Sequence, residues 1–138
     1  VVFSHLPVYP FTHGRETEVS ADHDLERILR KHGVDVYLSG HHHAFYPGYR
    51  EGIRFVSQAC LGAGPRALLG TGTHSERAIT LLEVADDGSL TVRALAAPDF
   101  SREIDRSALP RSISSRFGTM IRDDLATSAG AGGTARVE

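Results

Sequence analysis

Three consecutive histidines, His41, His42 and His43, follow a glycine in the interior of the chain, within the segment SGHHHAFYP. Histidine is the most common metal-ligand side chain, and its neutral ring binds Zn, Fe, Mn or Ni through one nitrogen. If the backbone stays extended here, alternate side chains point in opposite directions, so that His41 and His43 share one side. The triplet therefore predicts two metal ligands, with His42 facing solvent or contacting the ligands rather than the metal.

A further candidate ligand, His5, follows VVFS, a short apolar run that predicts a buried strand. His41 follows VDVYLSG, whose alternating Val and Leu residues predict a second strand. Parallel strands joined by a helix cross over right-handedly in nearly all cases, and ligands gather outside their carboxyl ends. We therefore expect His5 and His41 to meet at one edge of one sheet. His43 would add a third imidazole at this edge. Clustered imidazoles are costly to charge together, so the cluster favours a metal site over a surface loop.

The segment that joins the two strands has the pattern of an amphipathic helix. Ser20 or Asp22 can cap its first amides, and Gly33 offers the left-handed position after its last turn. The positions at i, i+3, i+4 and i+7, which should face the core, are Leu25, Ile28, Leu29 and His32.

The rest of the chain is expected to add mostly antiparallel strands. Strands are predicted for GIRFVSQA, RAITLLEVA and LTVRALA, and the Asp-Gly of ADDGS between the last two indicates a hairpin. We expect residues 1–100 to form the domain and residues 101–138 to form a carboxyl-terminal extension to it. That extension is expected to hold one short helix and a disordered, small-residue-rich tail. The helix is placed on Phe117, Met120, Ile121 and Leu125.

The composition limits the class of protein. With 138 residues, of which 41% are hydrophobic, the chain forms at most one domain. A formal charge of -2 argues against a nucleic-acid partner, and no apolar run approaches the roughly 20 residues of a membrane span. Because the chain opens with VVFSHLP, without methionine and within a predicted strand, we expect it to be the later part of a longer protein.

The segments SHLPVYPFTHG and VDVYLSGHHHAFY resemble the last two motifs of the calcineurin-like metallophosphoesterases, and among them the purple acid phosphatases most closely. The resemblance covers about residues 1–96. It implies an α/β fold that forms part of a four-layer αββα sandwich, of which residues 1–100 would be the carboxyl-terminal half. It further implies a pair of divalent or trivalent Fe, Mn or Zn ions, one held by His5 and His41 and the other by His43.

The same resemblance implies phosphoric ester hydrolysis, in which the dinuclear metal centre activates water for in-line attack on a phosphate ester substrate. His13 resembles the proton donor of these phosphatases and would protonate the departing alkoxide. Arg50, Arg54 and Arg66 have the right chemistry to bind phosphate, but we expect them on a solvated face. We predict no functional role for His74 from the sequence.

The chain departs from the family in the ligands that it lacks. It has no Gly-Asp, no Asp-x-His and no asparagine in 138 residues, so the family's earlier motifs are absent. Three neutral imidazoles cannot hold two cations roughly 3.5–4 Å apart, because nothing offsets the repulsion between the ions. We therefore expect the amino-terminal half of the same protein to supply a bridging carboxylate, and this chain alone to be inactive.

Two alternatives stay open. The chain can be a non-catalytic module that binds a single metal ion. It can also belong to the amidohydrolase barrels, which carry His-x-His after a strand. The barrels place that motif on their first strand, whereas here the strand end that carries His5 comes earlier in the chain.

Overall fold

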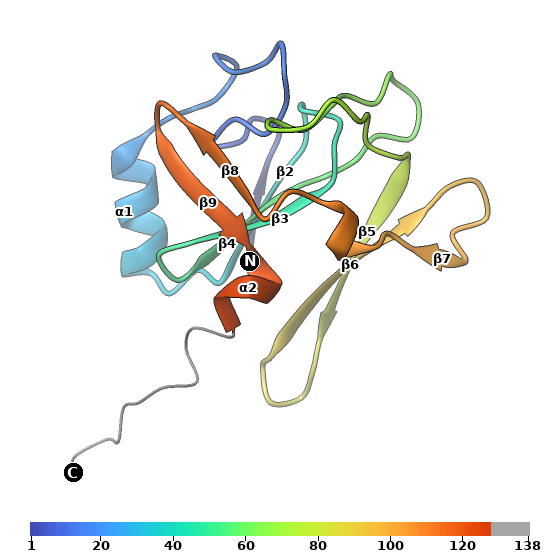
Figure 1. The fold of residues 1–138 in the computed structure, drawn as a ribbon. Helices are drawn as coiled ribbons and strands as arrows, with labels where there is room; N and C mark the ends of the chain where they lie inside the picture. The colour runs from blue at the N-terminus through green and yellow to red at the C-terminus, as the bar shows by residue number, and fades with distance from the viewer. Residues whose placement is uncertain (128–138) are drawn as a thin grey trace.

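Residues 1–127 are described by the structure, a computed structural model, as a mixed α/β fold with two sheets and few helices (Figure 1). The elements in chain order are β1 (Val2–Ser4), α1 (His23–Lys31), β2 (Val36–Ser39), β3 (Tyr46–Arg50), β4 (Ile53–Ser57), β5 (Ala78–Val84), β6 (Leu90–Ala96), β7 (Arg102–Glu103), the 3-10 helix η1 (Arg106–Ala108), β8 (Ser112–Ser115), β9 (Gly118–Arg122) and α2 (Asp123–Thr127). No helix in this part of the chain is long and apolar enough to cross a membrane.

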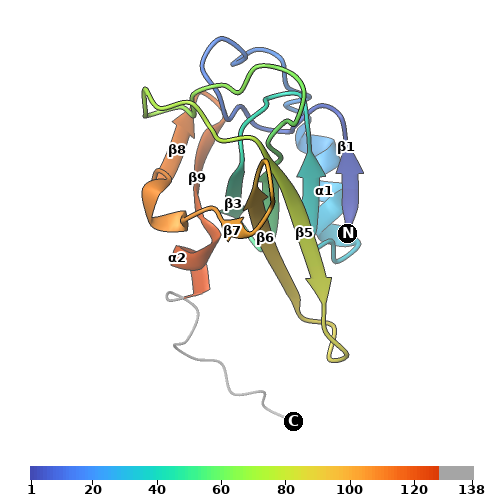
Figure 2. The same ribbon diagram turned by 90° about the vertical axis from the view of Figure 1, so that its right-hand side faces the viewer.

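The larger sheet has six strands in the order β1-β2-β4-β3-β9-β8. Strands β1 and β2 are parallel, as expected for a strand–helix–strand unit, and Figure 2 shows them pointing to the same end of the sheet. Strand β4 also pairs in parallel with β2, although mostly antiparallel strands were expected after this unit. Strands β3, β9 and β8 complete the sheet by antiparallel pairing. The smaller sheet contains the predicted β5–β6 hairpin and the short strand β7.

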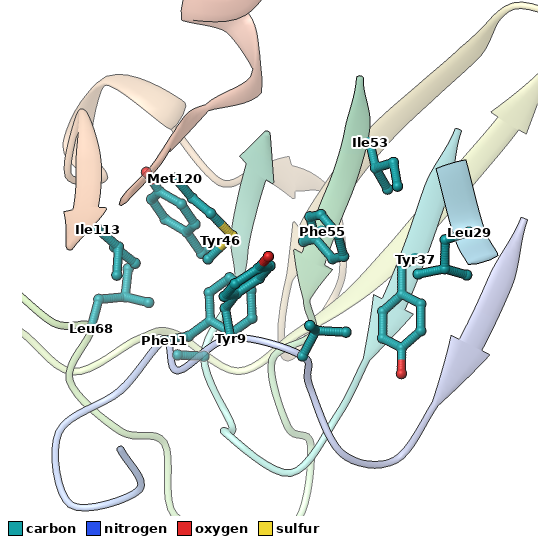
Figure 3. Close-up of a cluster of buried hydrophobic side chains, with 12 residues drawn as sticks. Tyr9, Phe11, Leu29, Tyr37, Tyr46, Ile53, Phe55, Leu68, Ile113 and Met120 are labelled. Carbon is teal, nitrogen blue, oxygen red and sulfur yellow. The ribbon is translucent and has the colours of Figure 1, made fainter. Parts of the chain in front are cut away.

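Side chains that alternate along β2 and β4 form two separate cores, because successive residues of a strand face opposite sides of a sheet. Val36 and Val56 pack against the smaller sheet, in a cluster that includes Val92. Tyr37 and Phe55, each one residue away, face the other side and pack in a cluster with Leu29 of α1 (Figure 3). The described chain thus has three layers, namely a helix, the six-stranded sheet and the three-stranded sheet.

Strand β1 forms where it was predicted, but it is not buried. It lies at the edge of the six-stranded sheet, paired on one side only with β2. Phe3 is 79% exposed and Val1 is 54% exposed. The expectation of a buried strand was wrong. An apolar run indicates that a strand prefers burial, but the order of strands in the sheet decides whether other elements cover it.

Helix α1 has the predicted ends, and two of the four residues predicted to face the core, Leu25 and Leu29, do so. Asp22 caps it, accepting hydrogen bonds from the amides of Asp24 and Leu25 at 2.9 and 3.1 Å, and Gly33 adopts a left-handed conformation with φ of 61°. Ile28, expected in the core, is 46% exposed, and Glu26 is buried instead.

Glu26 is buried because polar partners meet its carboxylate there. The Tyr9 hydroxyl donates a hydrogen bond to it, and an Arg30 guanidinium N–H donates another at 2.8 Å. A buried carboxylate is tolerated when it is paired in this way. Apolar spacing was therefore right for Leu25 and Leu29, wrong for Ile28 and His32, and did not identify Glu26.

The helix predicted across residues 117–125 is mainly a strand. Met120 and Ile121 belong to β9, and only the five residues of α2 that follow are helical. β9 pairs with both β3 and β8, so β8 and β9 are built into the larger sheet, whereas β7 belongs to the smaller one. Met120 packs in the same core as Phe55, which explains why the segment is held extended. The predicted disordered tail falls mostly on residues 128–138, which lie outside the described part of the chain.

Candidate metal centre

Two of the predicted ligands, His5 and His41, meet at the carboxyl ends of neighbouring parallel strands. The register pairs Ser4 of β1 with Ser39 of β2, so the residues just beyond these strands are close in space. The Nε2 atom of His5 lies 3.0 Å from the Nδ1 atom of His41, with the rings edge to face. At a zinc–nitrogen distance of about 2.05 Å, nitrogens so spaced would subtend an angle of about 94° at a single ion. This angle is smaller than the tetrahedral angle of a zinc site, so the rings, which lie at hydrogen-bond distance here, would separate slightly to bind one ion together.

The other nitrogen of His41 faces a carboxylate that sequence reasoning did not single out. Nε2 of His41 contacts the Glu18 carboxylate, which also forms an ion pair with Arg15. An ionised carboxylate only accepts hydrogen bonds, so Nε2 of His41 must carry the proton and donate it. In the neutral ring, Nδ1 then carries the lone pair that faces His5. Carboxylates commonly orient metal-ligating histidines in this manner.

Glu18 stays ionised in this setting. Hydrogen bonds from Arg15 and then from His41 hold the pKa of the Glu18 carboxyl below its ordinary value. The only sequence signal for this role was an acidic residue in the loop between β1 and α1. A loop residue carries no periodicity that would direct it to a site, so its partner is decided by the path of the loop.

The backbone of the histidine triplet is not extended. His41 and His43 adopt left-handed conformations with φ of 63° and 54°, and the segment forms bends rather than a strand. Residues other than glycine rarely adopt such angles, and those that do concentrate at functional sites. The assumption of an extended chain was therefore wrong. The side-chain directions follow from these two turns instead of from strand alternation.

His42 does separate from its neighbours, but it turns into the protein. It is completely buried. The amide of Phe11 donates to its Nδ1 at 3.1 Å, and its Nε2–H donates to the Glu18 carbonyl oxygen at 3.1 Å. Burial is the main cause that lowers the pKa of His42, which keeps the ring neutral. Of the two predicted alternatives, a solvent-facing position was wrong, because hydrogen-bond partners from the preceding loop satisfy both nitrogens. His42 instead supports the loop that carries Glu18, whose carboxylate contacts His41.

The third predicted ligand, His43, lines a cavity of about 430 Å³ that also contains His13. Neither His5 nor His41 is among the residues that line this cavity. The Nδ1 atom of His43 lies 3.3 Å from the carbonyl oxygen of Gly64, to which it can donate. That hydrogen bond would leave Nε2 of His43 as the nitrogen with an available lone pair.

Within residues 1–127, no three His, Cys, Asp or Glu side chains are grouped so that they could hold a metal ion. The donor set that these residues bring together is two imidazole nitrogens oriented by one carboxylate. Such a pair fits part of the coordination shell of one ion, which in zinc sites takes at least three protein ligands. A bridging carboxylate for a second ion would have to come from outside the described residues.

Comparison of the chain with protein-family models, with curated proteins and with solved structures finds no match in any of the three.

Proposed function

We propose that this chain is the carboxyl-terminal part of a metal-dependent phosphoesterase of the calcineurin-like type, with the rest of its metal ligands supplied by a preceding half of the same protein. The observation that carries the proposal is the 3.0 Å approach of His5 Nε2 to His41 Nδ1, with Glu18 orienting His41. The fold proposed with it is the four-layer αββα sandwich, which would add a second helical layer outside the three-stranded sheet.

In this proposal His5 and His41 bind one ion and His43 contributes to a second. The metal, when bound, supplies Lewis acidity toward a phosphoryl oxygen and toward water. The residues of this chain then have separate tasks. Glu18 keeps the Nδ1 lone pair of His41 aimed at the ion. His13, exposed at the rim of the cavity that His43 lines, is placed where it can give a proton to the departing alkoxide.

The test requires a longer protein that contains the sequence preceding residue 1. Hydrolysis of a generic aryl phosphate should depend on added Mn, Fe or Zn, and His43→Ala should abolish it. His23→Ala, on the exposed start of α1, serves as the matched histidine control and should keep full turnover. Metal-independent hydrolysis, or unchanged turnover in His43→Ala, would remove the basis of the assignment.

A second candidate function is a non-catalytic module that binds one metal ion. It is favoured by the grouping of only two imidazoles and one carboxylate within residues 1–127. This candidate predicts one ion per chain in the longer protein, with no hydrolysis at any metal concentration. A stoichiometry of two ions per chain with turnover would exclude it.

A further inference from the structure

The cavity beside His43 collects groups that bind anions. Its volume of about 430 Å³ lies within the range of small-molecule sites. The residues that line it are His13, His43, Ala63, Gly64, Pro65, Arg66, Ala67 and His74. None of them is acidic. Arg66 and His74 have no part in the proposed metal centre, so the cavity raises the question of what they bind.

Backbone hydrogen bonds hold the four lining segments in fixed positions. The amide of Arg66 donates to the carbonyl oxygen of His43 at 3.2 Å, and the amide of His13 donates to that of Ala67 at 3.1 Å. Ala67 and His74 also pair in an antiparallel bridge. The cavity is therefore built from segments that support each other, rather than from independent loop tips.

Among the lining residues, Arg66 has a buried side-chain donor without a hydrogen-bond partner in the described part of the chain. Its side chain is partly buried, and its Nε atom is shielded from solvent without a hydrogen-bond acceptor among residues 1–127. Arginines elsewhere in the described chain, such as Arg102 and Arg122, lie beside carboxylates. A guanidinium N–H that is removed from water and left without an acceptor is costly, so this Nε–H favours an anion at the cavity wall.

The electrostatic setting of the cavity agrees with this requirement. The guanidinium of Arg66 is positively charged. Its N–H donors form a planar fork that matches the spacing of phosphate oxygens. An acidic residue that does not line the cavity, Glu16, lies 3.8 Å from Nδ1 of His13. His13 and His74 add imidazole N–H donors from two other segments, so donors from three segments converge on one space.

We infer that Arg66, His74 and His13 form a subsite for the terminal phosphoryl group of a phosphate monoester, placed against His43. The inference rests on the proposed function for the choice of phosphate among anions. Arg66 would bind two of the terminal oxygens and His74 the third, while His13 would lie beside the ester oxygen that it protonates in the proposed function. A monoester presents three terminal oxygens to these donors, whereas a diester presents two and carries less charge.

The test uses inorganic phosphate and the full chain stripped of metal with a chelator, so that binding does not depend on the metal centre. Titration calorimetry and phosphorus NMR should detect saturable binding. Arg66→Gln should weaken phosphate binding at least ten-fold, and His74→Gln should weaken it several-fold. Arg111→Gln, an exposed arginine outside the cavity, is the matched control and should bind like the parent chain. Thermal unfolding of each variant checks that it is folded.

Loss of binding in Arg66→Gln but not in Arg111→Gln would support the subsite. The subsite would be overturned if the parent chain did not bind phosphate, or if Arg66→Gln bound phosphate as tightly as the parent chain. Dimethyl phosphate should bind at least ten-fold more weakly than inorganic phosphate, and equal affinity would overturn the choice of a monoester. His5→Ala should keep phosphate binding in metal-free protein. If the longer protein shows no hydrolysis while this binding persists, the proposed function fails and the subsite stands.

Discussion

The Nε2 atom of His5 and the Nδ1 atom of His41 lie 3.0 Å apart, although 36 positions separate the two residues in the chain. The parallel pairing of β1 with β2 brings them together, because both residues follow strands that end at the same edge of the sheet. Two ring nitrogens at this distance must share a proton or a cation, since their lone pairs would otherwise repel. The proposed metal centre begins from this edge, whereas the proposed phosphate subsite lies in the cavity that His43 lines.

Replacing His5 by alanine should remove one of two ligands to a bound ion. We expect the affinity of the chain for Zn²⁺ to fall by at least about 100-fold, because a single imidazole with no second protein ligand binds weakly. Competition with a chromophoric chelator measures this. His32→Ala, which changes an exposed histidine just beyond α1, should leave the affinity unchanged. Equal zinc affinities in all three proteins would argue against the site.

Replacing Glu18 by glutamine should keep the shape of the side chain but remove its charge. The amide no longer enforces the Nε2-protonated form of His41, so we expect zinc affinity to fall by about 10–100-fold. Glu16→Gln, in the same loop but paired with His13, is the control and should have little effect. If the two variants bind zinc alike, Glu18 has no role in orienting the ligand.

His42→Ala should destabilise the fold. The change leaves a buried space, and it strips the amide of Phe11 and the carbonyl of Glu18 of their partner. We expect the free energy of unfolding to fall by about 2–4 kcal/mol, measured by urea denaturation. Because His42 holds the loop that carries Glu18, zinc affinity should weaken as well. A stability within about 0.5 kcal/mol of the parent would contradict the buried hydrogen bonds.

The neutral state of His42 also makes stability depend on pH. Its pKa is lowered in the folded chain from an ordinary value of 6.5, mainly by burial, so the unfolded chain binds more protons as pH falls through that value. The free energy of unfolding should be greatest above about pH 6.5 and decrease below it. His42→Gln, compared with the parent at about pH 7.5 and about pH 5.5 in chelator, should show a smaller decrease. An identical decrease would assign the effect to other groups.

Gly48→Ala should test the packing of β3 against its neighbours. A Cβ atom at this position would lie 2.9 Å from the Phe55 carbonyl oxygen and 3.2 Å from the Met120 sulfur. We expect a loss of about 1–3 kcal/mol in the free energy of unfolding, because backbone cannot move aside easily in the centre of a sheet. Gly72→Ala, where the added atom would meet nothing within 4 Å, is the control. Equal stability of the two variants would contradict the pairing of β3 with β4 and β9.

Local patterns in the sequence predicted the elements whose signals are short range. The run before His5, the alternation of Val36 and Leu38, and the Asp-Gly between β5 and β6 each specify their own segment. Asp22 and Gly33 marked the ends of α1 for the same reason, since a cap acts on the backbone within one turn. Strand β3 was missed because Pro47 and Gly48 are rare in strands, and burial against Met120 outweighs that preference.

The sequence by itself determined that His5 and His41 share one edge of a sheet, because a helix joining two strands makes them parallel and their carboxyl ends then meet at the same edge. Only the tertiary structure decided which groups surround that edge. Glu18 reaches His41, His42 is enclosed by the loop at Phe11, and Arg66 faces the cavity of His43. Each of these contacts joins segments with no shared periodicity, so they depend on the packing of loops and not on any pattern along the chain.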